Sequence, residues 1–333
     1  NITVTWGISV FATLGAINVN SGDGFIVEHA AVLDAATYMN IQVDEGETGD
    51  QDAVGADVEL YGSVSALTVN IQGNTDNDTI LVDVKLINGD VRIKGGTGED
   101  AITINRLHNR GGSFIVDGES GTDIYTINRT GNNADYIIDV AESGAEADGA
   151  DTLTINGTAD ADTFLLRANF VAALHTDSSD GYASAVERIN YDRNINARLT
   201  INGHAGKDFF YSDDNSSITT LDGGAGNDTF QIGQLFGIDR KSSLGTVALG
   251  DEVETTDTTL GFLSRGNSLP MVVYGGDGED SITVFSNKAI TKLYGEDGDD
   301  NFIVRAFLTR GTARSASGSD VELFAGDGAD NIP

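Results

Sequence analysis

The chain has 333 residues and a formal net charge of −33, from 52 acidic and 19 basic residues. This charge disfavours nucleic acid and anionic membrane surfaces as partners, because both attract positive charge. Cys is absent, which excludes disulfides and thiolate metal sites; no apolar run approaches the roughly 18–20 residues of a membrane helix.

Residues 1–70 predict degenerate repeats at the N-terminal side. NITVTWGISV alternates as a strand does, whereas SGDGF and DEGETGDQD are typical of turns. Residues 31–39 are compatible with a short helix or a buried irregular segment. Residues 56–71 predict a strand, a turn and a second strand, which lead into the first clear motif.

From Ile71 onward one unit occurs nine times, as in LDGGAGNDTFQI at 221–232. An aliphatic residue stands two places before the first turn position, and a large apolar residue stands two places after the sixth. The sixth turn position is aspartate in every unit: Asp78, Asp100, Asp123, Asp162, Asp208, Asp228, Asp280, Asp300 and Asp330.

The spacing of these aspartates predicts a solenoid. Consecutive ones lie 22, 23, 39, 46, 20, 52, 20 and 30 residues apart, so we expect coils of about 20–23 residues. Stacked coils with short alternating strands predict an all-β, right-handed parallel β-helix. We expect its motif-bearing part at 71–333, with loop insertions near 128–150, 167–195, 233–270 and 305–320. The whole is expected to be one continuous domain and a piece of a longer protein.

The turn has the chemistry of a calcium half-site. Glycine at the first, second and fourth positions permits positive φ, which turns carbonyl oxygens to one side, and the sixth-position aspartate adds a carboxylate. Calcium takes six to eight oxygen ligands, so one turn supplies about half of them and the stacked neighbour completes the shell. The 20-residue steps predict that Asp208 pairs with Asp228, and Asp280 with Asp300.

A metal-free ladder of turns is the alternative. Stacked aspartates repel one another, and further acids at the same turns add to this repulsion: Glu99, Asp277, Glu279, Asp297 and Asp299. Asparagine or serine would serve better in a purely structural turn. The composition therefore favours a bound cation.

The motif resembles the glycine- and aspartate-rich nonapeptide of the RTX, or haemolysin-type, calcium-binding repeat family. GGTGEDAIT (95–103), GGAGNDTFQ (223–231) and GGDGEDSIT (275–283) match GGxGxDxUx at every specified position. The resemblance implies several calcium ions, bound by the aspartates and by carbonyls at positions one, three and five. These carbonyls belong to Gly95, Thr97, Glu99, Gly223, Ala225, Asn227, Gly275, Asp277, Glu279, Gly295, Asp297 and Asp299.

The chain departs from the family pattern in two ways. Asp76 and Asp160 replace the fourth-position glycine, and Glu119 and His204 replace the second-position glycine. The motifs are also dispersed rather than in tandem, so we expect a wider coil with one calcium-binding edge. Dispersed repeats of this kind are similar to stretches of very large secreted bacterial surface proteins.

The hypothesis is a secreted or cell-surface structural or adhesive module, folded by calcium and not an enzyme. We expect partners to be adjacent repeats or further copies of the chain, stacked end to end into filaments or a surface layer, and cell-surface or matrix polysaccharide. The alternative is a calcium-dependent carbohydrate-active β-helix enzyme, a polysaccharide lyase or epimerase. The four histidines are far apart and no catalytic motif occurs, which disfavours it.

Overall fold

The computed structural model describes residues 1–44, 54–84, 86–105, 107–108, 111–132, 134–145, 147–176, 182–242, 247–308 and 320–332. Every regular element in these ranges is a β-strand. The chain forms two compact units, one of Asn1–Asn156 with Ser184–Ala197 and the other of Gly157–Ala183 with Arg198–Pro333. The prediction of an all-β chain is confirmed for the residues described.

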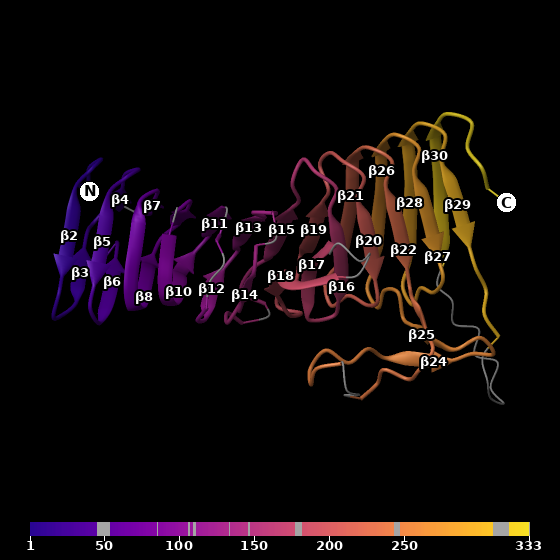
Figure 1. Cartoon of the computed structure of the whole chain (residues 1–333), viewed down its shortest axis with the longest axis horizontal. Helices are drawn as coiled ribbons and strands as arrows, with labels where there is room; N and C mark the ends of the chain where they lie inside the picture. The colour runs from indigo at the N-terminus through magenta and orange to yellow at the C-terminus, as the bar shows by residue number, and fades with distance from the viewer. Residues whose placement is uncertain are drawn as a thin grey trace. The chain divides into compact units, whose positions relative to one another are not determined.

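The first unit contains two sheets whose strand pairs are all parallel (Figure 1). One sheet has the order β1 (Ile2–Val4), β4 (Gly24–Val27), β7 (Asp57–Leu60), β9 (Thr79–Val82), β11 (Ala101–Asn105), β13 (Ile124–Asn128) and β15 (Thr152–Asn156). The other has the order β2 (Ser9–Ala12), β5 (Val32–Ala35), β8 (Ser63–Thr75), β10 (Leu86–Gly98), β12 (Phe114–Gly121), β14 (Tyr136–Val140) and β18 (Tyr182–Asn190). Beside it, β3 (Ile17–Asn20) pairs with β6 (Tyr38–Gln42), and β6 pairs with β8.

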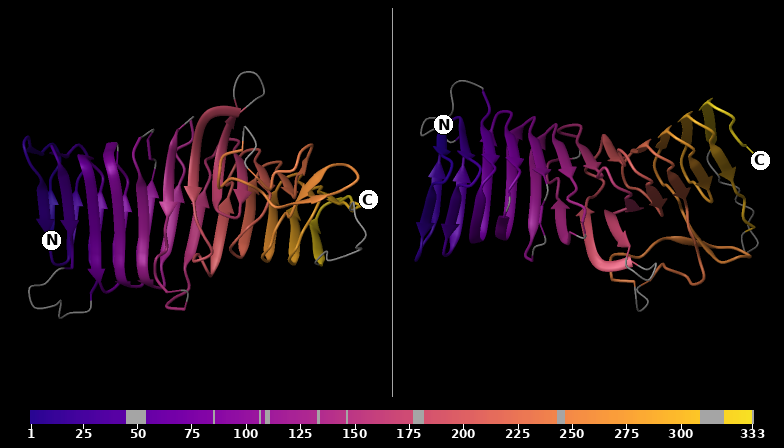
Figure 2. Two further views of the ribbon diagram at one scale, coloured as in Figure 1. Left: turned by 90° about the horizontal axis from the view of Figure 1, so that it is seen from below. Right: turned by 45° about the horizontal axis from the view of Figure 1, so that its top comes forward.

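The second unit repeats this arrangement (Figure 2). One parallel sheet has the order β19 (Arg198–Asn202), β21 (Thr219–Ala225), β26 (Met271–Asp277), β28 (Thr291–Asp297) and β30 (Val321–Asp327). The other has the order β17 (Phe170–Thr176), β16 (Thr163–Arg167), β20 (Phe209–Ser212), β22 (Thr229–Ile232), β27 (Ser281–Val284) and β29 (Asn301–Val304), in which only β16 and β17 are antiparallel. A small antiparallel sheet joins β23 (Leu235–Phe236), β25 (Phe262–Ser264) and β24 (Thr255–Asp257).

The core is built from columns of equivalent residues. Parallel pairing without a register shift places Phe164 beside Phe210 and Phe210 beside Phe230. Their rings stack at centroid separations of 5.2 and 4.6 Å, and all three are buried. The alternation of the sequence determines this, because every second residue of a strand points to the same face. The predicted apolar column after each aspartate is thus confirmed, except at Ile332, which is 59% exposed.

Three of the four segments predicted as loop insertions contain strands. The stretch 128–150 contains β14, the stretch 167–195 contains β17 and β18, and the stretch 233–270 contains β23, β24 and β25. Most of the stretch 305–320 lies outside the described residues. Residues 31–39, where a helix or an irregular segment was compatible with the sequence, form β5 and begin β6.

Candidate metal centres at the glycine–aspartate turns

The second and fourth turn positions adopt the left-handed backbone conformation. Gly224 has φ 88° and Gly226 has φ 144°. Side chains at the second position accept the same conformation, with φ 87° at Asn74, 74° at Glu119, 76° at His204 and 74° at Glu296. Such angles cost free energy for residues other than glycine. These four turns therefore keep the left-handed conformation without the glycine, whereas Thr158, at the second position of another turn, does not adopt it.

The first-position glycine is required for a different reason. Its φ is not in the left-handed region, which corrects the expectation from the sequence. A Cβ added to Gly223 would instead collide with Oδ2 of Asp228 and with the carbonyl oxygen of Gly275 in the neighbouring turn. The same collision, with the equivalent aspartate and carbonyl, would occur at Gly73, Gly203, Gly275 and Gly295. Two acceptor oxygens therefore converge beside each of these α-carbons.

The sixth-position aspartates connect neighbouring turns. At eight of these turns Oδ1 of the aspartate accepts a hydrogen bond from the main-chain N–H of the aspartate one turn earlier, and Asp78 Oδ1 accepts from the N–H of Ala56. Asp228 Oδ1, for example, accepts from Asp208 at 2.7 Å, and Asp300 Oδ1 accepts from Asp280 at 2.9 Å. Both pairs were predicted from their 20-residue spacing, and their adjacency is confirmed.

These hydrogen bonds form a ladder of turns within each unit. In the first unit the ladder runs through Asp78, Asp100 and Asp123 to Asp151. The N–H of Asp151 then donates to Oδ1 of Asn196 at 2.9 Å, so an asparagine follows the aspartates there. In the second unit the ladder runs through Asp162, Asp208, Asp228, Asp280, Asp300 and Asp330.

The second carboxylate oxygen is buried without a hydrogen bond at most turns. This holds for Oδ2 of Asp78, Asp100, Asp123, Asp228, Asp280 and Asp300, whose residues are at most 2% exposed. A buried acceptor that lacks a donor costs about 1–3 kcal/mol, and more when it is charged. Each of these oxygens thus needs a proton or a cation.

Burial changes the acidity of these carboxyl groups. It raises the pKa of Asp78 and Asp280 to about 7, and that of Asp100 and Asp123 to about 6, although a main-chain N–H donor opposes each shift. The pKa of Asp228 and Asp300 is raised for the same reason. Neighbouring carboxylates add repulsion, for example Asp228 and Asp300 on Asp280. A cation at these oxygens would oppose both effects.

The remaining predicted ligand residues differ in burial according to their position in the turn. First-position residues such as Gly275 are buried, whereas the third- and fifth-position residues are exposed: Thr97, Glu99, Ala225, Asn227, Asp277, Glu279, Asp297 and Asp299. Third-position carbonyls already accept hydrogen bonds between turns, as when Asp277 accepts from the N–H of Gly226 at 2.8 Å. The structure thus brings the aspartate Oδ2 atoms together with first-position carbonyls.

The fourth-position aspartates differ from one another. Asp76 has φ 63° and so takes the conformation that glycine has in the other turns. The N–H of Asp160 donates to the hydroxyl of Thr158 at 3.2 Å, and the N–H of Thr158 donates to Oδ2 of Asp162 at 2.6 Å. The Asp162 oxygen is therefore bonded within its own turn. In the turn that contains Asp160, the Oδ2 atom of Asp162 therefore has a hydrogen-bond donor. In the turn that contains Asp76, the Oδ2 atom of Asp78 has none.

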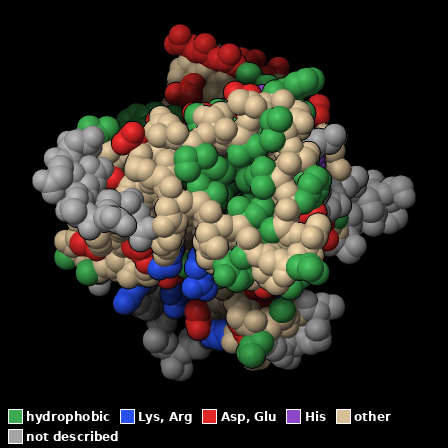
Figure 3. Space-filling view, turned by 90° about the vertical axis from the view of Figure 1, so that its left-hand side faces the viewer, with side chains coloured by type: hydrophobic (Ala, Val, Ile, Leu, Met, Phe, Trp, Pro, Cys, Tyr) green, Lys and Arg blue, Asp and Glu red, His purple; other side chains and the backbone are tan. Residues whose placement is uncertain are grey.

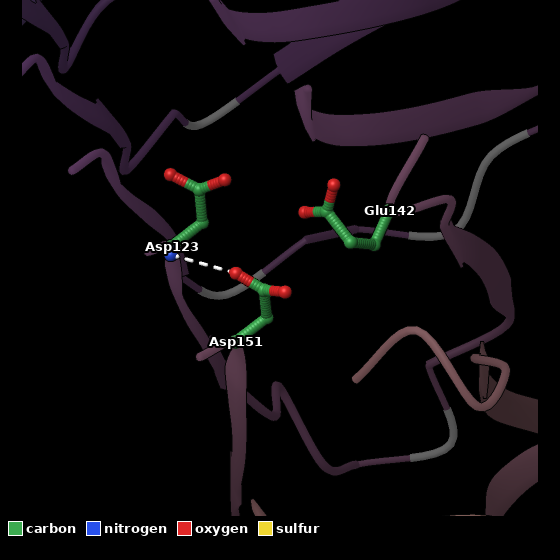
Figure 4. A group of neighbouring side chains, drawn as sticks. All are labelled: Asp123, Glu142 and Asp151. Atoms are coloured by element: carbon green, nitrogen blue, oxygen red, sulfur yellow. Dashed lines mark hydrogen bonds between the residues drawn. The ribbon is translucent and has the colours of Figure 1, made fainter. Parts of the chain in front are cut away.

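The sequence analysis did not identify three residues that lie in or beside the ladder of the first unit. Asp151 occupies the sixth position of a further turn, because Leu153 pairs with Tyr125 in register. Glu142 lies close to it, with one carboxylate oxygen of Asp123, Glu142 and Asp151 within 4.8 Å of the others (Figure 4). Asn196 follows Asp151 in the hydrogen-bond order. The signal was present in Gly149, Asp151 and Leu153, which keep the fourth, sixth and eighth positions of the motif.

No helix of the described residues is long and apolar enough to cross a membrane. Comparison with known proteins adds no relative to this description. No family model matches the chain, and no curated protein sequence matches it.

Proposed function

We propose that this chain is a calcium-dependent structural or adhesive module of an exported protein, folded as a right-handed parallel β-helix. The order of strands supports the fold: β4, β5, β7 and β8 belong alternately to one parallel sheet and to the other. A crossover between parallel strands of the same sheet is right-handed in nearly all cases. Repeats of this kind bury their inward side chains only by stacking on their neighbours.

The observation that carries the calcium proposal is the convergence of unpaired oxygens at the turns. Oδ2 of Asp228 is buried without a hydrogen bond, and the carbonyl oxygen of Gly275 approaches the same α-carbon, that of Gly223. A set of carboxylate and carbonyl oxygens fits calcium, which prefers hard oxygen ligands. The aspartates and the first-position carbonyls would hold the ion, together with oxygens of the third and fifth positions.

The bound ion supplies positive charge where the chain places only acceptors. It would also offset the net charge of −33, much of which lies in these turns. Ligand binding to the folded state alone stabilises it by about 2.7 kcal/mol at a concentration one hundred times Kd. Calcium at extracellular concentration would thus favour folding, whereas a calcium-poor compartment would leave the chain loosely folded before export.

The experiment is a comparison of folding with and without calcium. Far-ultraviolet circular dichroism and thermal unfolding of the full chain are measured in calcium, in magnesium and in a calcium chelator. We expect a cooperative β transition whose midpoint rises with calcium and falls on chelation. An identical transition in all three conditions would overturn the proposal, because the sites would then contribute no free energy to folding.

The first repeat of the first unit, which contains β1 and β2, supports assembly through that end of the unit. Trp6, Ile8, Phe11 and Leu14 are 71, 50, 60 and 95% exposed. Figure 3 shows hydrophobic side chains gathered on this face. The strands β1 and β2 also offer an open edge, which invites further parallel strands. We propose that a repeat of the same kind stacks there; Phe11→Ser with Leu14→Ser should then reduce the mass measured by light scattering.

Polysaccharide binding is the second candidate, supported by a groove of the second unit. This cavity of about 550 Å³ is lined by Leu165, Arg167, Leu174, Tyr211, Gln231, Gln234, Phe236 and Arg240. The guanidinium of Arg240 lies 4.7 Å from the ring centroid of Phe236, and Arg167 Nε donates to Asp213 Oδ2 at 2.9 Å. Arginines and aromatic rings suit anionic sugars. Incubation with uronate polymers, followed by measurement of ultraviolet absorbance, tests for the unsaturated products that a lyase would form.

A further inference from the structure

Three acidic side chains of the first unit meet in a buried cluster that the glycine–aspartate motif does not describe (Figure 4). Asp123 precedes β13, Glu142 follows β14, and Asp151 precedes β15. Their residues are 0, 5 and 2% exposed. One carboxylate oxygen of each lies within 4.8 Å of the other two. Three segments of the chain therefore bring three carboxyl groups together away from solvent.

Hydrogen bonds hold each carboxylate in place. Asp123 Oδ1 accepts from the N–H of Asp100, and Asp151 Oδ1 accepts from the N–H of Asp123, both at 2.9 Å. Glu142 Oε2 accepts from the hydroxyl of Tyr125 at 2.6 Å, and its Oε1 accepts from the N–H of Gly144 at 2.8 Å. The positions of the three carboxyl groups are thus fixed by neutral donors, none of which carries a positive charge.

One atom of the cluster points to a missing ligand. Asp123 Oδ2 is buried and has no hydrogen-bond partner. Since Oδ1 accepts from Asp100 of the preceding repeat, Oδ2 is the oxygen of Asp123 that is left for a ligand. No lysine or arginine among the described residues forms an ion pair with any of the three carboxylates. Buried charges are normally paired or bound to a metal.

We propose that Asp123, Glu142 and Asp151 form a side-chain site for a hard divalent cation, with calcium as the ion that fits the oxygen ligands. The proposal rests on the calcium-dependent function for the identity of the ion and adds a site of different composition. At this repeat Glu119 replaces a glycine of the motif and pairs with Lys94. Residues 141–151 also lack the two leading glycines. Carboxylates from the chain between β14 and β15 here take the role that carbonyls have elsewhere.

The test counts ions in the full chain. Equilibrium dialysis against calcium, followed by elemental analysis, is applied to the wild type, Glu142→Gln and Asp151→Asn. Each variant removes one charge from the cluster. Asp151→Asn keeps an acceptor for the N–H of Asp123, whereas Glu142→Gln keeps only one of the two acceptors that Tyr125 and Gly144 use. The matched control is Glu322→Gln, at a half-exposed residue that pairs with Lys292. We expect each cluster variant to bind one calcium ion fewer per chain, and the control to bind the same number as the wild type.

Thermal unfolding in calcium and in chelator separates a metal ligand from a purely structural residue. If Asp151 binds the ion, Asp151→Asn reduces the calcium-dependent rise of Tm and does not lower Tm in chelator, because its hydrogen bond to Asp123 is kept. Equal losses of Tm in both conditions would overturn the inference, because they would indicate lost hydrogen bonds alone. An unchanged ion count in both variants would also overturn it while leaving the turn sites intact. Absence of calcium binding in the wild type would instead overturn the proposed function.

Discussion

The main-chain N–H of Asp228 donates a 2.7 Å hydrogen bond to Oδ1 of Asp280, although 52 residues separate the two. The small sheet β23–β25–β24 lies in the chain between them. The parallel pairing of β22 with β27 brings the two turns together, with Phe230 opposite Ile282. The ladder therefore continues across a long excursion of the chain as it does across the 20-residue step from Asp280 to Asp300.

Asp280→Asn tests the charge at the centre of the second ladder. The amide keeps an oxygen for the N–H of Asp228 but loses the negative charge. In calcium we expect a loss of up to about 3 kcal/mol, the contribution of one ion at one hundred times Kd. In chelator we expect no loss, because a neutral side chain is less costly to bury. Urea unfolding under both conditions measures this, with the exposed Asp34→Asn as the control.

Gly223→Ala tests the close approach of neighbouring turns. The added methyl group would collide with Asp228 Oδ2 and the Gly275 carbonyl oxygen. We expect a loss of about 1–3 kcal/mol, as for other overpacked sites, and weaker calcium binding. Gly237→Ala is the matched control, since nothing lies within 4 Å of its added Cβ. Equal denaturation midpoints for the two variants would contradict the packing argument.

The pH dependence of stability should reverse when calcium is removed. Burial raises the pKa of Asp78 and Asp280 to about 7, above the unfolded value of about 3.9. Without calcium the folded state binds more protons between these values, so stability rises as pH falls from about 8 to 5. With calcium, protons compete with the ion and the same change in pH lowers stability. Measurements of Tm at pH 8 and pH 5, in calcium and in chelator, give the two signs.

Glu296→Gly tests the backbone strain at the second turn position. Glu296 has φ 74°, an angle that glycine adopts at little cost. We expect stabilisation of up to about 1 kcal/mol, because the left-handed conformation costs about 1–2 kcal/mol for other residues and glycine adds entropy to the unfolded chain. The variant Glu296→Gln removes the charge but keeps the strain. Equal urea midpoints for Gly and Gln at this position would attribute any effect to charge alone.

Part of the site was predictable because its signals are local. The aspartate at the sixth position, the apolar residue two places later and the step from Asp208 to Asp228 all follow from alternation and spacing. The positive φ of Gly224 and Gly226 was predictable for the same reason. Asp151 was missed because its turn lacks the leading glycines, although Leu153 still marks the strand after it.

The role of Gly223 could not be predicted from local conformation. Its φ is ordinary, and its requirement arises only from Asp228 Oδ2 and a carbonyl of the next turn. Glu142 was equally hidden, because nothing in its neighbourhood in the sequence relates it to Asp123. Such residues are defined by contacts between repeats rather than by the preferences of a single segment.

The sequence by itself determined the repeating unit: the turn, the strand after it and the residues that face inward. These depend on backbone angles and two-residue alternation, which act over a few neighbouring residues. Only the tertiary structure decided which turns are neighbours where the spacing is irregular. It joined Asp228 to Asp280, brought Glu142 to Asp123 and placed Asn196 after Asp151. Strand pairing depends on the packing of whole repeats, so residues far apart in the chain become adjacent without any mark in the intervening sequence.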